Sequence, residues 1–98
     1  MSLKTNVSLN AAAIVCEHVA TQCCSILSAF RTEPDAPEDS GWQFFCGKVE
    51  EEDPRLAKVW LLKEVLELEP SLLEYLDMPP GIQIWRSSPK EDWLTRKF

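Results

Sequence analysis

The sequence predicts one small domain of the α+β class. It has 98 residues, which is enough for one compact domain and too few for two. Its hydrophobic content of 45% is typical of a globular chain with a real core. Apolar runs with strand-like and helix-like patterns are separated by proline-containing breaks at 33–41, 50–54 and 78–81. We expect residues 1–9 to form a flexible N-terminus and residues 10–98 to form the domain.

The N-terminal half contains one ambiguous run and one clear strand. Residues 11–30 open with alanines that favour helix, but residues 23–30 (CCSILSAF) favour a strand. Residues 42–47 (WQFFCG) alternate, with Trp42 and Phe44 on one face and Phe45 on the other. Because both faces are partly apolar, we expect a central or covered strand here.

The C-terminal half predicts helices followed by a strand. Residues 55–77 have helical propensity, although 59–62 (VWLL) suits a buried strand leading into a helix equally well. Pro70 is expected to open a second short helix at its first turn. Residues 81–87 (GIQIWRS) form a predicted strand between a Pro-Pro-Gly turn and a Ser-Ser-Pro break.

The charge pattern argues for a protein partner and against nucleic acid. The net charge is −6, whereas binding to phosphate backbones needs an excess of lysine and arginine. Eight of the sixteen carboxylates lie between Glu33 and Asp53, where Lys48 is the only basic residue. Such a segment either steers a basic partner or simply keeps the protein in solution. No apolar run has the length of a membrane span, so we expect no membrane partner and a cytoplasmic location.

The sequence lacks the residue patterns of common catalytic sites. His18 is the only histidine, and no nucleophile elbow surrounds any serine. Asp39 and Ser40 are therefore read as the turn that launches the Trp42 strand. Three glycines in total exclude the usual phosphate-binding loops. We expect a protein that is not an enzyme.

Four cysteines offer a different function. Cys16, His18, Cys23 and Cys24 are close in sequence, and they define the alternative of a cysteine-based redox or metal-responsive regulator. Structural zinc sites, however, usually have paired and regularly spaced ligands. We therefore expect buried free thiols, with no metal and no other cofactor.

Four tryptophans are many for a chain of this size. Trp60 and Trp85 lie in apolar strands and are expected in the core. Trp42 and Trp93 border charged segments, so they are the better interface candidates of the four, although core or satellite packing is still favoured for each.

Three stretches resemble a known family. They are DSGWQFFCG at 39–47, LEPSLLEYLD at 68–77 and PGIQIWR at 80–86, and together they resemble the immunity protein 33-like family of bacterial polymorphic toxin systems. The resemblance spans roughly residues 12–88. It implies an antiparallel sheet of about four to five strands with two or three short helices. It also implies strands at 12–16, 24–31 and 58–62, a helical turn at 17–22 and a helix from 63.

The resemblance also implies a function without chemistry. Such a protein would bind a cognate toxin and neutralise it by occlusion. The sequence departs from the family at Gln43, often basic there, and at Lys48, often acidic there. A different possibility is a domain whose partner is another copy of itself. Our candidate partner-binding residues are Glu38, Asp39, Trp42, Glu50, Glu51, Glu52 and Asp53.

Overall fold

A mixed sheet forms the body of the molecule. The computed structural model describes residues 7–22, 24–47 and 54–97. Within these ranges, six strands pair in the order β4-β1-β3-β2-β5-β6. The strands are β1 (Ala12–Val15), β2 (Ser28–Arg31), β3 (Asp39–Phe45), β4 (Lys58–Leu61), β5 (Ile82–Trp85) and β6 (Leu94–Lys97). The α-helices are α1 (Glu17–Gln22) and α2 (Leu62–Leu68), and the 3₁₀ helices are η1 (Pro54–Leu56) and η2 (Pro70–Tyr75).

The α+β class is confirmed, although the sheet has six strands instead of about four to five and is mixed instead of antiparallel. β1 pairs in parallel with β3, while the other neighbouring strands are antiparallel. The reason lies in the chain path. Helix α1 separates β1 from β2, and β3 fills the position between them. The chain reverses direction between β1 and β2 and again between β2 and β3, so β3 runs in the same direction as β1.

The individual elements follow the predictions in part. Residues 58–61 form a strand that leads directly into α2, as the resemblance implied, and Pro70 opens η2. In the run at 24–31 only Ser28–Arg31 is a strand. The last strand, β6, was not predicted, because its four residues are all exposed and leave no apolar pattern in the sequence.

The first described residues lie against the domain. The backbone N–H of Val7 donates to the Asp77 carboxylate (3.2 Å), and the carbonyl of Leu9 accepts from the N–H of Lys63 (2.9 Å). Residues 1–6 lie outside the described ranges. The predicted flexible N-terminus therefore stays a prediction for that segment.

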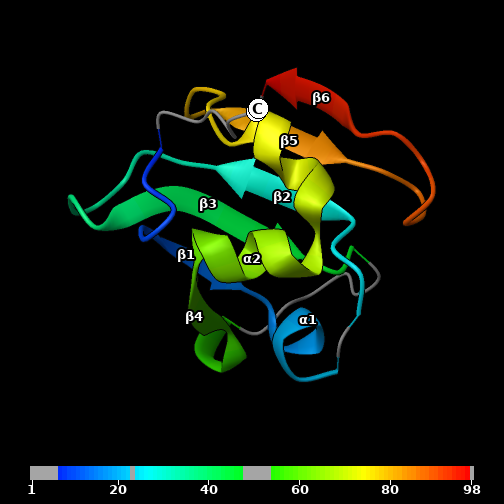
Figure 1. The fold of residues 1–98 in the computed structure, drawn as a ribbon, viewed down its shortest axis with the longest axis horizontal. Helices are drawn as coiled ribbons and strands as arrows, with labels where there is room; N and C mark the ends of the chain where they lie inside the picture. Colours follow the sequence, from blue (N-terminus) through cyan, green and yellow to red (C-terminus); the bar gives the residue numbers. More distant parts are fainter. Residues whose placement is uncertain (1–6, 23, 48–53, 98) are drawn as a thin grey trace.

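The core lies on one side of the sheet. Figure 1 shows α2 and the yellow helical segment η2 in front of the strands. Side chains from these helices and from α1 pack with the inward-facing residues of the four central strands. The cluster includes Ala13, Val15, Val19, Ala29, Trp42, Phe44, Leu62, Val65, Leu72, Leu76 and Ile84. The structure is thus a two-layer arrangement, and the described helices cover only one face of the sheet.

The tryptophans follow our expectation in part, because the two that were the better interface candidates are the most buried. Trp42 and Trp93 are core residues, with 0% and 8% of their surface exposed. Trp60 is half-buried and packs against the border of the core. Trp85 is half-buried and is not a member of the core cluster. The charge of neighbouring residues was thus a poor guide to burial.

A buried arginine joins the C-terminal half to the sheet. The guanidinium of Arg86 donates to the carbonyl of Ile26 from both Nε (3.2 Å) and Nη2 (3.0 Å). It also donates to the Pro89 carbonyl and forms an ion pair with Glu69 at 2.7 Å. Its Cζ atom lies over the Trp93 ring, 4.2 Å from the ring centroid. One charged group therefore fixes three loops, and each of its three nitrogens donates to at least one acceptor.

Glu69 is held by the same network. Its Oε2 accepts from the Ser71 hydroxyl (2.6 Å), and the Ser71 oxygen accepts from the indole of Trp93 (2.9 Å). Burial alone raises the pKa of Glu69. The hydrogen bonds from Ser71 and Arg86, together with the charge of Arg86, outweigh this effect and hold the pKa below its ordinary value of 4.5.

This network predicts a pH-dependent loss of stability in Glu69→Gln. The folded pKa is depressed, so ionised Glu69 stabilises the fold above pH 4.5, and this contribution is lost as the pH falls through the lowered pKa. We expect the free energy of unfolding at pH 7 to drop by about 2 kcal/mol. Urea unfolding from pH 7 to 3 measures this. The difference in unfolding free energy between Glu69→Gln and wild type should become smaller at acidic pH. The control Glu67→Gln, at an exposed position of α2, should change the unfolding free energy little. A difference that stays constant with pH would contradict the assignment.

Candidate partner-binding surface

The Asp-Ser-Gly-Trp stretch at 39–42 forms a bulge in β3. Ala12 pairs with Asp39 and Ile14 pairs with Gln43, so β3 advances four residues while β1 advances two. The Ser40 hydroxyl stabilises this bulge, because it donates to the Ala12 carbonyl (2.6 Å) and accepts from the Trp42 N–H (3.1 Å). The sequence read Asp39 and Ser40 as a turn before the strand. They are instead its first two residues.

Gly41 is required at the centre of the bulge. Its φ is +81°, and a Cβ placed there would lie 2.1 Å from the carbonyl oxygen of Thr32. That oxygen belongs to the neighbouring chain segment, whose N–H donates to the Gly41 carbonyl (2.9 Å). Both the backbone conformation and the close approach therefore exclude a side chain.

The bulge turns Trp42 into the core. Its indole stacks on Phe44 at 5.8 Å and donates to the Leu76 carbonyl (3.1 Å). No surface of Trp42 is exposed, so the structure does not present it as the aromatic anchor that we expected. Asp39 is half-buried, and its carboxylate accepts from the N–H groups of Gly41 (2.9 Å) and Asp35 (3.2 Å).

The acidic candidates divide into three groups. Glu38 is exposed in the loop before β3, and it is available to a partner. Asp39 caps the bulge and shows only part of its surface. The candidates at 50–53 lie outside the described residues. Glu38 and Asp39 thus lie at the start of β3, one in the preceding loop and one as the first residue of the strand, and the remaining acidic candidates stay predictions.

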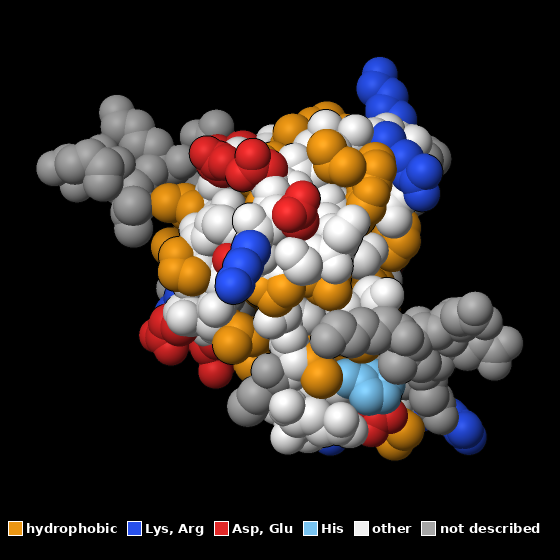
Figure 2. Space-filling model, turned by 90° about the vertical axis from the view of Figure 1, so that its right-hand side faces the viewer, with side chains coloured by type: hydrophobic (Ala, Val, Ile, Leu, Met, Phe, Trp, Pro, Cys, Tyr) orange, Lys and Arg blue, Asp and Glu red, His pale blue; other side chains and the backbone are white. Residues whose placement is uncertain are grey.

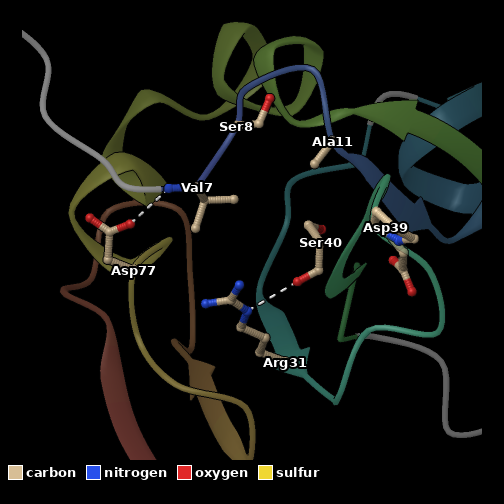
Figure 3. Close-up of a pocket in the computed structure, with 8 residues that line it drawn as sticks. Val7, Ser8, Ala11, Arg31, Asp39, Ser40 and Asp77 are labelled. Carbon is tan, nitrogen blue, oxygen red and sulfur yellow. Dashed lines mark hydrogen bonds between the residues drawn. The ribbon is translucent and has the colours of Figure 1, made fainter.

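A hollow of about 350 Å³ lies beside this loop. Figure 3 shows Val7 and Asp77 on one side of it, with Arg31 and Ser40 meeting on the other. The Arg31 guanidinium donates to the carbonyls of Ser40 (3.0 Å), Met78 (2.7 Å) and Leu76 (3.2 Å). Three backbone acceptors therefore hold this cation as a brace between β2 and the end of η2.

The hollow is poorly equipped for chemistry. Its lining combines two carboxylates, two serines and this arginine, without an imidazole or a thiol among the described residues. The Ser40 hydroxyl donates its proton to the Ala12 carbonyl, and the neighbouring Asp39 carboxylate accepts from the backbone N–H groups of Gly41 and Asp35. General acid–base or nucleophilic catalysis needs a base within hydrogen-bond reach of a free nucleophile. The hollow is better suited to contact than to reaction.

The second candidate surface is the sheet face opposite the core. We call it the open face, and it carries the outward-pointing residues of all six strands. Cross-strand register places Ile14 beside Val59 and Gln43, and Phe30 beside Gln43 and Gln83. The apolar members of the open face are Ile14, Phe30, Phe45, Val59, Trp85 and Leu94.

Aromatic side chains form the centre of the open face. Phe30 and Phe45 meet edge to face at 5.8 Å, and both are half-buried. Near the far edge, the guanidinium of Arg96 lies 4.8 Å from the centroid of Trp85, and its Nε donates to Gln83 (2.7 Å). An apolar and aromatic centre with polar residues between and around it is the composition of a protein-binding surface.

The comparison with known protein families agrees with this geometry. Residues 13–97, nearly the whole chain, match the immunity protein Imm33 domain. The chain belongs to the Imm33 immunity-protein family. No match was found among curated proteins or among solved structures. All three stretches that carried the resemblance lie inside the matched range, so the family prediction is confirmed.

Family membership gives the Imm33 chain a protein partner in general terms, and the fold shows two surfaces that suit one. The sequence missed the open face. A signal was present, because Gln43 and Gln83 alternate with buried residues and mark a face that is not fully covered. Among the described helices, none is long and apolar enough to cross a membrane.

Part of the alternative cysteine set also meets in space. The donor atoms of Cys16 and His18 lie within 4.8 Å of each other and of Cys46, which the sequence had not included. Cys24 is half-buried outside this group, and Cys23 lies outside the described residues. The Imm33 chain therefore contains one compact cluster of sulfur and nitrogen donors in its described part.

Gly41→Ala should destabilise the fold strongly. The variant combines an unfavourable backbone conformation with a collision against the Thr32 carbonyl, so we expect a loss of at least about 2 kcal/mol in the free energy of unfolding. Gly81→Ala is the matched control, since its φ is +93° but no atom lies within 4 Å of the added Cβ. We expect about 1 kcal/mol there. Urea denaturation measures both, and equal losses would show that the collision is relieved without cost.

Proposed function

We propose that this chain is a non-catalytic immunity protein that neutralises a cognate toxin by covering its working surface. The open face carries this proposal. It is a broad apolar and aromatic surface on a chain whose family consists of immunity proteins. Occlusion requires a rigid surface that matches the partner, and a sheet anchored on its other side to a packed core supplies that rigidity.

The arrangement of polar and apolar groups supports binding through this face. Half-buried aromatic rings lie on the two central strands β2 and β3, and more exposed aliphatic side chains lie toward the edges. Interfaces commonly have this anatomy, with aromatic anchors surrounded by residues that exclude water. We place Trp85 and Phe30 as the anchors, in the role that the sequence had assigned to Trp42.

The acidic segment supports a basic partner. The net charge is −6, and Glu38 is exposed on the loop before β3. Carboxylates at the border of an interface accelerate encounter with a basic surface and contribute less to its final affinity. Toxins that act on nucleic acids carry basic surfaces, so we propose that Glu38, Asp39 and residues 50–53 steer such a toxin toward the open face.

Ile14→Glu tests the open face. Ile14 is 37% exposed, and a carboxylate there would be buried without a partner when the toxin binds. We expect the affinity for the cognate toxin domain to fall at least about 30-fold. The measurement is calorimetric titration of the purified pair, supported by growth protection when both are co-expressed.

Leu68→Glu is the control for this experiment. Leu68 lies on α2, on the helical side of the molecule, and its exposure of 40% nearly equals that of Ile14. It should retain wild-type affinity, and thermal melting should show both variants folded. If Leu68→Glu weakened binding while Ile14→Glu did not, the helical side would be the interface and the open face would be excluded.

Reversal of Glu50, Glu51 and Glu52 to lysine tests the steering role. We expect the association rate at low ionic strength to fall on the order of tenfold and the salt dependence of binding to decrease. The matched control reverses the exposed Glu67, Glu74 and Glu91, which changes the net charge equally. Stopped-flow association measures both sets. If both sets of reversals slowed association equally, only the total charge would matter. If the reversal at 50–52 had no effect, the acidic segment would serve solubility and not steering.

A further inference from the structure

Two cysteines and the only histidine converge at one end of the sheet. Cys16 directly follows β1, His18 lies in the first turn of α1, and Cys46 directly follows β3. Because β1 and β3 run in parallel, their carboxyl ends meet at the same edge. The Cys16 N–H donates to the Phe44 carbonyl (3.0 Å), which holds the two strand ends together. The two sulfurs and an imidazole nitrogen all lie within 4.8 Å of one another.

We propose that Cys16, His18 and Cys46 form a binding site for a thiophilic divalent metal ion, with zinc as the best match. Two thiolates and one imidazole are the donors that zinc prefers. In a tetrahedral site with zinc–sulfur bonds of about 2.3 Å, neighbouring donors are about 3.8 Å apart. The observed limit of 4.8 Å requires a closure of about 1 Å at most.

The surroundings suit a metal ion. Cys16 and Cys46 are each 1% exposed, so they provide a dry, sulfur-rich interior. His18 is only half-buried and gives the ion a route from the surface. Figure 2 shows the histidine in pale blue at the molecular surface, beside hydrophobic side chains. Three protein ligands leave the fourth tetrahedral position for water or for a side chain of a partner.

The burial of the thiols separates this site from a catalytic one. A cysteine nucleophile paired with His18 would need a sulfur that a substrate can approach. Both sulfurs in the cluster are closed to molecules of that size. A single ion needs no such access. The site would instead tie α1 to the ends of β1 and β3, so binding would stabilise the folded chain by an amount that rises with the logarithm of the ion concentration.

Cobalt titration provides the test. The chain is reduced with a phosphine, stripped with a chelator and titrated with Co²⁺, whose thiolate charge-transfer and tetrahedral d–d bands report the ligands directly. We expect one equivalent to bind, zinc to displace it, and Zn²⁺ to raise the melting temperature. Removing a direct ligand should cost at least about 100-fold in affinity, since even supporting residues around metal sites are worth 10- to 100-fold.

The variants distinguish the cluster from other thiols. Cys46→Ser and His18→Gln should lose the cobalt bands and the zinc-dependent melting shift, while Cys24→Ser, outside the cluster, should keep both. If Cys46→Ser fails to fold, the half-exposed His18→Gln decides the question on its own. The proposal is overturned if folded wild-type chain shows no thiolate charge-transfer band, if cobalt binds without one, or if Cys24→Ser loses binding as severely as His18→Gln.

Discussion

Parallel pairing of β1 with β3 brings together two strands that the chain does not connect directly, and much of the structure depends on it. The pairing needs the bulge at Ser40 and Gly41. There the Ser40 hydroxyl donates to β1 in place of a backbone N–H, and Gly41 adopts a positive φ that other residues avoid. Through this bulge Trp42 enters the core. At the opposite end of the same pair, Cys16 and Cys46 become neighbours of His18. This one strand pairing thus positions the core residue Trp42, the bulge at the start of β3 and the cluster of Cys16, His18 and Cys46.

The one-sided packing of the helices has an equal effect on the surface. All described helices that contribute to the core do so from one side, and Arg86 and Arg31 fasten the C-terminal segments there through backbone carbonyls. The opposite side keeps its apolar and aromatic residues at the surface. In a family of immunity proteins, an arrangement of this kind combines a stable scaffold with a surface for a partner. The core and the candidate interface therefore use largely different side chains, and Phe45 is shared, because it also packs against the core cluster.

The tryptophans show where prediction from the sequence reached its limit. The charged neighbours of Trp42 and Trp93 suggested an interface, yet both are buried, because the bulge redirects one ring and the plane of Arg86 covers the other. Trp85 sits in an apolar strand and nevertheless belongs to the open face. Burial depends on which side of the sheet receives the helices, and a single strand's alternation cannot specify that side.

The sequence by itself determined the α+β class and the Pro70 helix start, because these depend on local propensity. Short stretches of adjacent residues determined the family, and only the resemblance to that family indicated the strand-to-helix passage at 58–68, which propensity had left open. The tertiary structure alone decided the parallel pairing, the sixth strand, the role of Arg86 and the meeting of Cys16 with Cys46. Each of these joins residues distant in the chain through backbone hydrogen bonds or through a shared position at the end of the sheet. Such contacts leave no periodic pattern in the amino-acid order, since strand order and direction are fixed only when the chain packs.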